Sequence, residues 1–234
     1  MIWKDLPWDS DFFGCRIAAA YQEQGDEAET LRKLCREAAV DCLYLFLNHP
    51  LTAGFGSVLQ EAGAVCADLK TTFRKNNLQR WSADESFISI PDEISEECYR
   101  LAVRSGWKSR FYVDEKFRPM QDALYRKWVD TCSGNRPDAK VWEFHAAAGQ
   151  LQGMMCAGIE GKTGKLGLIS VSPDCQGRGI GSCLMRILEN FYLDHGCTSG
   201  EIVTQFDNSG ACGLYRKFGY RITDIKEVWH LWKV

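Results

Sequence analysis

The chain has 234 residues, of which 45% are hydrophobic, and its formal net charge is −3. This mildly acidic balance argues against a general nucleic-acid binder, which would need a basic surface. The sequence has no run of 18 apolar residues and no apolar signal segment after Met1, so we expect a cytoplasmic protein that neither crosses nor binds a membrane. Eleven cysteines occur without a Cys-x-x-Cys pair, which predicts neither a disulfide framework nor a metal site.

The first third of the chain has the pattern of a small α/β domain. Helix and strand patterns alternate, and polar residues then cluster over 76–85. We expect helices over 26–40 and 51–62 and strands over 42–47 and 65–74. The sequence therefore predicts a small N-terminal α/β domain over 1–80 and a larger domain over 85–234.

Two helices are expected in the middle of the chain, over 94–105 and 117–132. Between them lies a segment that combines aromatic and polar residues and contains Ser109, Arg110 and Phe111. A guanidinium such as that of Arg110 can bind a phosphate or carboxylate bidentately, although a solvated loop arginine has the same sequence pattern.

A glycine-rich turn after residue 171 is the most informative segment. The residues Leu-Ile-Ser-Val-Ser-Pro-Asp-Cys-Gln-Gly-Arg-Gly-Ile-Gly-Ser over 168–182 predict a strand, a turn and the start of a helix. Because Gly177, Gly179 and Gly181 lack Cβ atoms, successive N–H groups can approach an anion at the positive end of that helix. The turn lacks the Gly-Lys-Ser/Thr of a P-loop and the later acidic strand end of a dinucleotide-binding fold. We therefore predict a diphosphate-containing nucleotide or coenzyme as ligand.

The last third of the chain continues the alternation of strands and helices. Apolar residues recur at helical spacing from Ile180 to Phe191, and Gly196 is a plausible helix stop. We then expect a strand over 201–206, a cap at Asn208, a helix over 211–218 and a final strand segment over 220–234.

The segment Gln176-Gly-Arg-Gly-Ile-Gly181 matches the Gln/Arg-x-x-Gly-x-Gly/Ala motif, and the chain thereby resembles the GCN5-related N-acetyltransferases (GNAT). The resemblance implies an α/β (α+β) fold with a mixed central sheet flanked by helices and splayed beside the loop. It also implies acetyl-CoA as cosubstrate. The residues that it assigns to coenzyme binding are Ile169, Ser170, Val171, Gln176, Gly177, Arg178, Gly179, Ile180, Gly181, Ser182 and Asn208.

The same resemblance assigns chemistry to Tyr215, which follows Asn208 by two helical turns. In the family a tyrosine at this place protonates the departing thiolate, and a phenol with an ordinary pKa near 10 can do so. A buried core aromatic would have the same local pattern. The family implies direct attack by the amine, whose proton needs an acceptor: Asp68 is the first candidate, before Glu143, Glu160 and Asp174, and a water chain would also suffice.

Within the family the chain is most similar to the dTDP-fucosamine acetyltransferases, which acetylate dTDP-4-amino-4,6-dideoxygalactose. The similar segments are Trp8-Asp-Ser-Asp-Phe-Phe-Gly14, Ser109-Arg110-Phe111 with Asp114 and Phe117, Leu124-Tyr-Arg-Lys-Trp-Val129, and Thr204-Gln-Phe-Asp-Asn208. This branch implies a nucleotide amino sugar as acceptor, contacts from Ser109, Arg110 and Phe111, a role in polysaccharide biosynthesis and, by analogy, a homodimer. The glycine loop is fuller than is usual in the branch, which leaves the configuration of the sugar open.

Three alternatives remain at this point. The acceptor could be a polyamine, an antibiotic or a protein N-terminus, and the chain could instead be a non-catalytic acyl-CoA-binding module. A covalent route through Cys175 or Cys212 would need a histidine base such as His195 or His230, and no spacing ties these residues together. The exact acceptor and the identity of the base are not fixed by the sequence.

Overall fold

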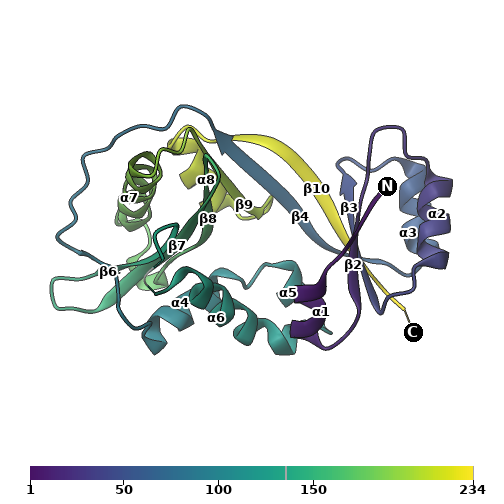
Figure 1. Ribbon diagram of the computed structural model, residues 1–234, viewed down its shortest axis with the longest axis horizontal. Helices are drawn as coiled ribbons and strands as arrows, with labels where there is room; N and C mark the ends of the chain where they lie inside the picture. Colours follow the sequence, from purple (N-terminus) through teal and green to yellow (C-terminus); the bar gives the residue numbers. More distant parts are fainter. Residues whose placement is uncertain (135, 234) are drawn as a thin grey trace.

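The computed structural model describes residues 1–134 and 136–233 (Figure 1). Its core is one mixed sheet of ten strands in the order β1-β2-β3-β10-β4-β9-β8-β7-β6-β5. The strands are β1 Ile2–Asp5, β2 Ile17–Tyr21, β3 Cys42–Asn48, β4 Val65–Lys75, β5 Ile88–Ser89, β6 Ala139–His145, β7 Leu151–Glu160, β8 Thr163–Val171, β9 Ser199–Gln205 and β10 Arg221–Trp232. The α-helices are α1 Pro7–Phe13, α2 Ala28–Glu37, α3 Ala53–Glu61, α4 Glu96–Ser105, α5 Arg110–Val113, α6 Gln121–Cys132, α7 Ile180–Asp194 and α8 Ser209–Lys217.

Two long strands, β4 and β10, connect the two halves of the molecule, as Figure 1 shows. They pair with each other antiparallel, β10 also pairs with β3, and β4 pairs with β9. The N-terminal half therefore shares its sheet with the C-terminal strand. The division of the chain into a small domain over 1–80 that contributes to the acceptor site and a larger domain over 85–234 stays a prediction.

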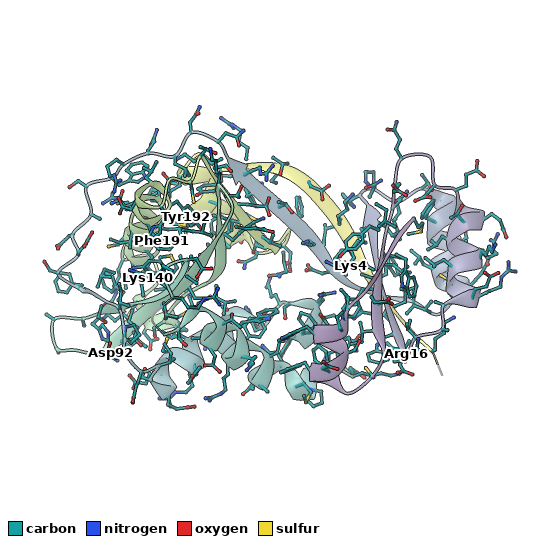
Figure 2. The ribbon with its side chains drawn as sticks, viewed as in Figure 1. Lys4, Arg16, Asp92, Lys140, Phe191 and Tyr192 are labelled. Atoms are coloured by element: carbon teal, nitrogen blue, oxygen red, sulfur yellow. The ribbon has the colours of Figure 1, made fainter. Side chains whose placement is uncertain are left out.

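Helices cover the two faces of the C-terminal half of the sheet. On one face α7 packs on β6, β7 and β8, and Phe191 and Tyr192 (labelled in Figure 2) supply buried rings. A Cβ at Gly164 would lie 2.2 Å from the Tyr192 ring, so β8 needs glycine there. On the other face α4 and α6 enclose a second apolar cluster with Met154 and Leu168. The expected mixed sheet with flanking helices is confirmed.

The sheet opens between β8 and β9. Their parallel pairing runs from Thr163↔Ser199 only to Leu166↔Ile202, although both strands continue beyond it. At the same point the pairing of β8 with β7 shifts register, which leaves Gly167 as a bulge. A Cβ on Gly167 would lie 3.1 Å from the Cys156 Sγ. The bulge and the end of the pairing together separate the strands, and the predicted splay beside the glycine loop is confirmed.

Most predicted elements are present with shifts of one to three residues at their ends. The helix expected over 117–132 begins with a 3₁₀ turn at Arg118–Met120 before α6. The elements that were not predicted are β1, α1, β2, β5 and the short helix α5, and no bounds were predicted for β6 and β7. Val234, the last residue of the predicted C-terminal segment, lies outside the described residues.

No helix of the described residues combines the length and the apolar character that a bilayer crossing needs. The described residues also contain no cluster of three or more histidine, cysteine or acidic side chains placed to hold a metal ion.

Candidate active site

A groove of about 820 Å³ lies between the end of β8, the glycine-rich turn and the start of α8. Of the residues expected to bind the coenzyme, those that line it are Ile169, Ser170, Val171, Gln176, Gly177, Gly179, Ile180, Gly181, Ser182 and Asn208. Arg178 is the exception, because its exposed side chain is not part of the lining in the described structure.

The glycine turn has the geometry of an anion cradle. Gly177 and Gly179 have φ angles of +76° and +87°, in the left-handed region that favours glycine. Gly179 directly precedes α7, whose first N–H groups face the groove side without partners in earlier turns of the helix. Lysines 108 and 217 also line the groove. These residues fit the diphosphate of a coenzyme.

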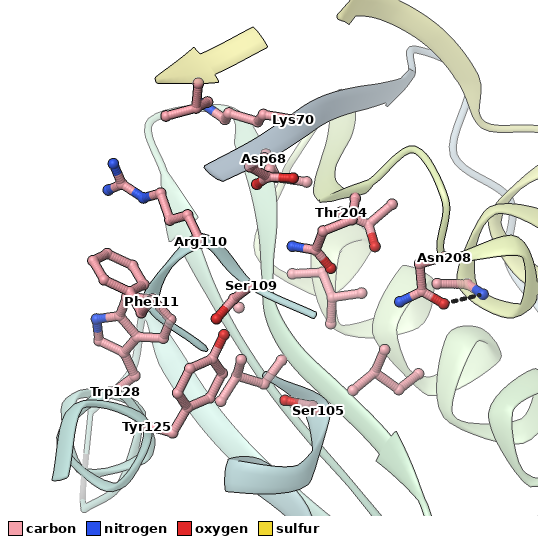
Figure 3. Close-up of a pocket in the computed structure, with 18 of the residues that line it drawn as sticks. Asp68, Lys70, Ser105, Ser109, Arg110, Phe111, Tyr125, Trp128, Thr204 and Asn208 are labelled. Atoms are coloured by element: carbon pink, nitrogen blue, oxygen red, sulfur yellow. Dashed lines mark hydrogen bonds between the residues drawn. The ribbon is translucent and has the colours of Figure 1, made fainter. Parts of the chain in front are cut away.

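A second, smaller cavity of about 310 Å³ lies where β4, β9 and the α4–α6 region approach one another (Figure 3). Its wall includes Asp68 and Lys70 from β4, Tyr125 and Trp128 from α6, and Tyr215 from α8. Ser109, Arg110 and Phe111, the residues expected to bind the acceptor, line it as well. We call it the acceptor cavity.

The groove and the acceptor cavity meet. Both are lined by Ser105, Ile169, Asn208 and Ala211, so a ligand in one can reach a ligand in the other. Ile169 lies on β8 beyond the last residue paired with β9, and Asn208 caps α8 by accepting a hydrogen bond from the Ala211 N–H at 3.2 Å. The opening of the sheet thus creates the passage, and the Asn208 cap fixes one side of it.

Asp68 is the acidic side chain of the acceptor cavity wall. Its Oδ1 is buried and has no hydrogen-bond partner within the described part of the chain. Burial raises the pKa of this carboxyl to about 7, against the opposing influence of the Arg110 charge. A carboxyl with such a pKa can accept a proton near neutral pH.

Tyr215 reaches the cavity from α8 and is 3% exposed. Its ring packs edge-on against Phe73 at 5.6 Å between centroids. Burial raises the pKa of Tyr215 above its ordinary value, so the phenol remains protonated at neutral pH and can donate a proton.

The segment with Ser109, Arg110 and Phe111 is fixed by an anchor on the C-terminal side of α5. Asp114 accepts hydrogen bonds from Trp232 Nε1 at 2.9 Å and from the Lys116 N–H at 2.9 Å, and His230 Nδ1 lies 2.6 Å from its Oδ2. Burial lowers the pKa of His230 to about 4, so this imidazole is neutral at pH 7 and donates to Asp114 through Nδ1. Strand β10 thereby holds α5 against the cavity.

The other candidate bases lie elsewhere. Glu143 is 3.0 Å from His145 Nε2, and Glu160 is exposed beside Lys165. Neither residue lines the groove or the acceptor cavity, and Asp174 does not line them either.

The cysteines expected for a covalent route have no histidine bonded to them in the described structure. His195 Nδ1 hydrogen-bonds with the Phe191 carbonyl, and His230 is engaged by Asp114. Burial raises the pKa of the Cys212 thiol, which disfavours the thiolate.

Sequence analysis missed Lys70 and Tyr125 as cavity residues. Lys70 could have been found from its spacing, because residues two apart on a strand point to the same face and Asp68 had been singled out. Tyr125 lies in the segment 124–129 that resembles the branch, but no local pattern placed it in the cavity: its ring occupies the space that Gly106 leaves, where a Cβ would lie 2.1 Å from the Tyr125 ring.

Comparison with known proteins agrees with this arrangement. Residues 100–220 match the model of the acetyltransferase (GNAT) family, which is more than half of the chain. The chain belongs to the GNAT family. This range includes the glycine turn, Asn208 and Tyr215, and the GNAT resemblance inferred from the sequence is confirmed.

A curated acetyltransferase of Pectobacterium atrosepticum is 32% identical over 76 residues, which are 32% of this chain and 54% of that protein. The match therefore spans about half the length of this relative. Two solved structures share the fold. A conserved protein of unknown function from Staphylococcus epidermidis has a TM-score of 0.63 at 12% identity and covers 94% of this chain and 85% of its own.

The second structure, a GCN5-related N-acetyltransferase from Sphaerobacter thermophilus, has a TM-score of 0.57 at 12% identity. It covers 97% of this chain and 75% of its own chain. Both similarities extend over the N-terminal half as well as over the GNAT motif region. At 12% identity these two structural similarities show the fold and do not identify an acceptor.

Proposed function

We propose that the protein transfers the acetyl group of acetyl-CoA to the amine of a nucleotide-linked amino sugar of the dTDP-4-amino-4,6-dideoxygalactose type. The observation that carries acetyl transfer is the junction of the groove and the acceptor cavity at Ile169 and Asn208, with Asp68 and Tyr215 in the cavity wall. The sugar rests on the similarity of the Ser109 segment to the dTDP-fucosamine branch. A cytoplasmic role in polysaccharide biosynthesis and a homodimer are further parts of this proposal.

In this mechanism the amine attacks the acetyl carbonyl carbon directly. The C–N bond forms as the C–S bond breaks, one amine proton passes to Asp68, and the phenolic proton of Tyr215 passes to the departing sulfur. Beyond Leu166, β8 still pairs with β7 but no longer with β9, and N–H groups on this open edge are suitable donors to the carbonyl oxygen during attack. Asp68 must therefore be deprotonated, and Tyr215 protonated, at the same pH. Their environments favour this, because the pKa of Asp68 is about 7 and that of Tyr215 is raised.

The test measures thiol release from acetyl-CoA with a panel of amino-sugar nucleotides in wild type and in Tyr215→Phe. We expect turnover with a dTDP-4-amino sugar, and a rate at least about tenfold lower in the variant, which is roughly 1.4 kcal/mol of transition-state stabilisation. Tyr192→Phe is the matched control, since the Tyr192 hydroxyl is buried, has no hydrogen-bond partner among the described residues and lies outside both cavities. Unchanged turnover in Tyr215→Phe would remove the phenol from the mechanism.

The same panel includes spermidine, an aminoglycoside and a peptide with a free N-terminus, which represent the other acceptor classes. Turnover with one of these amines, without turnover of any amino sugar, would contradict the proposed sugar acceptor and support acetyl transfer to another amine. Acetyl-CoA binding without turnover on any amine would favour a non-catalytic acyl-CoA-binding module.

A further inference from the structure

The acceptor cavity holds two cationic side chains that the reaction does not use. Lys70 lies two residues after Asp68 on β4, and Arg110 stands on the wall formed by α5 (Figure 3). Among the described residues, neither cation takes part in an ion pair. Most other buried or half-buried cations have a partner, as Lys75 does with Glu189 at 2.7 Å. The cavity therefore carries two cations without a directly paired carboxylate in the described structure, although the charge of Arg110 acts at longer range on Asp68 and Asp9.

Arg110 is held by aromatic rings and not by acids. Its guanidinium carbon lies 4.2 Å from the centroid of the Tyr44 ring and 4.4 Å from that of Phe111. Stacking of this kind fixes the plane of a guanidinium and leaves its N–H edge free. The Nη1 atom is buried and has no hydrogen-bond partner in the described structure. Burying a charged donor without an acceptor costs free energy, and an anion that accepted a hydrogen bond from Nη1 would remove that cost.

Lys70 supports the same conclusion independently. Its Nζ lies 5.4 Å from the centroid of the Phe46 ring, beside the same aromatic wall. Burial, followed by repulsion from Arg110, lowers the pKa of this lysine. Two cations that repel each other in a partly buried cavity are stabilised by an anion placed between or beside them.

We propose that Arg110 and Lys70 form an anion subsite of the acceptor cavity, which binds a phosphate or carboxylate group carried by the acceptor whose amine reaches Asp68. This inference rests on the proposed acetyl transfer and narrows its acceptor to molecules that carry both an amine and an anion. A polycationic acceptor is excluded by it, because a second ammonium would meet Arg110 and Lys70. The diphosphate of a nucleotide sugar and the carboxylate of an amino acid share the required chemistry.

Binding of anions is measured first, by calorimetry on the full chain with saturating CoA, so that the groove is filled. The probes are inorganic pyrophosphate and dTDP for the phosphate source and succinate for the carboxylate source. We expect one source to bind to wild type, and its Kd to rise at least about tenfold in both Arg110→Gln and Lys70→Met. Arg80→Gln is the control, since Arg80 pairs with Asp194 on the exterior, outside both cavities, and the Kd should not change.

The result that overturns the subsite is an absence of binding by all three probes, or binding that survives both substitutions in variants that melt as wild type does. Should one variant not fold, the other decides alone. The kinetic arm compares a dTDP-amino sugar with the same free amino sugar, and an amino acid with its amide. We expect kcat/KM to favour the anionic member at least about tenfold in wild type, and this preference to fall in Arg110→Gln.

The two proposals fail in different ways. Anion binding that depends on Arg110, without thiol release on any amine, would leave the subsite and overturn acetyl transfer. Equal turnover of anionic and neutral members of each pair would leave acetyl transfer and overturn the subsite.

Discussion

The groove and the acceptor cavity are adjacent but are built in different ways. The groove takes nearly half of its lining from one continuous stretch, the end of β8, the glycine turn and the start of α7, in which glycine and serine recur. The rest comes from the end of α4, the segment after it, the turn before α8 and α8 itself. The acceptor cavity takes its lining from nine elements, β3, β4, α4, α5, α6, β8, β9, α8 and β10. Within the described residues it presents buried polar atoms without partners on Asp68, Ser109 and Arg110. A binding site made of backbone suits a constant ligand, whereas one made of dispersed side chains can change its ligand with few substitutions.

The largest expected effect comes from removing the Asp68 carboxylate, which should change turnover in the acceptor cavity and leave coenzyme binding in the groove unchanged. Asp68→Asn removes the proton acceptor, so kcat should fall by about 10² or more, while the Kd of acetyl-CoA should stay unchanged. In wild type the base acts when deprotonated, so kcat/KM should rise with pH through about 7 and level off above it. In Asp68→Asn this rise of kcat/KM with pH should be absent. The charged groups that face Asp68 and influence its titration are Arg110, Lys70 and Asp207.

Stability supplies a second readout for the same variant. The folded pKa of Asp68 lies above its ordinary value of 3.8, so the folded state binds this proton more tightly, and stability falls as pH rises from about 4 to about 7. Asp68→Asn should therefore raise the Tm at pH 8. The control is Glu160→Gln, which changes an exposed carboxylate outside both cavities and should alter neither rate nor Tm. A wild-type rate in Asp68→Asn would mean that water, and not Asp68, accepts the amine proton.

The next effect concerns the anchor of the acceptor cavity. Asp114→Ala removes the acceptor for His230 and Trp232, so the free energy of unfolding should fall by about 3 kcal/mol. We expect the KM of the acceptor to rise while the KM of acetyl-CoA stays constant, and Asp114→Asn to restore part of both. Asp138→Ala, which breaks an exposed pair with Arg136, should cost less than about 1 kcal/mol in urea unfolding. A parallel rise in both KM values would mean that the two regions are not separate.

The smallest effect is on the groove. Gly179→Ala places a Cβ on a residue with φ of +87°, which should cost about 1–2 kcal/mol of stability. The KM of acetyl-CoA should rise about tenfold, because that cost falls on the anion-binding turn. Gly56→Ala in α3 has open space and no positive φ, so it should be neutral or slightly stabilising. Equal KM values in both variants would show that the turn tolerates the change.

The sequence predicted the groove far better than the acceptor cavity, and the reason is the range of the interactions. Gly177 and Gly179 adopt their conformations within a few residues of chain, and a strand before them and a helix after them complete the motif. Asp68 could be proposed as a base only by resemblance, and its burial depends on segments far away in the chain. Lys70 and Tyr125 were missed because pairwise packing across β4, α4 and α6 has no local periodicity.

The fold followed the same rule. The long helices and the strands β3 and β9 were predicted from their apolar patterns, whereas the buried strands β2, β6 and β7 were not. The short helix α5 was missed because four residues carry no periodicity and its position depends on Asp114, His230 and Trp232. The glutamine-and-glycine motif of the turn identified the family. The acceptor depends on side chains that a few substitutions can exchange, so its identity needs experiment.

The pairing of β10 with β3 also has a consequence for folding order. Trp232 lies opposite Cys42, and Val228 lies opposite Phe46 and Asp68 on its two neighbouring strands. During synthesis the edge of β3 that pairs with β10 therefore stays uncovered until nearly the whole polypeptide has been made. Contacts across such long sequence separations form slowly, because loop closure must precede them. The half of the molecule made first is thus the half completed last, and a nascent chain would need protection along that edge.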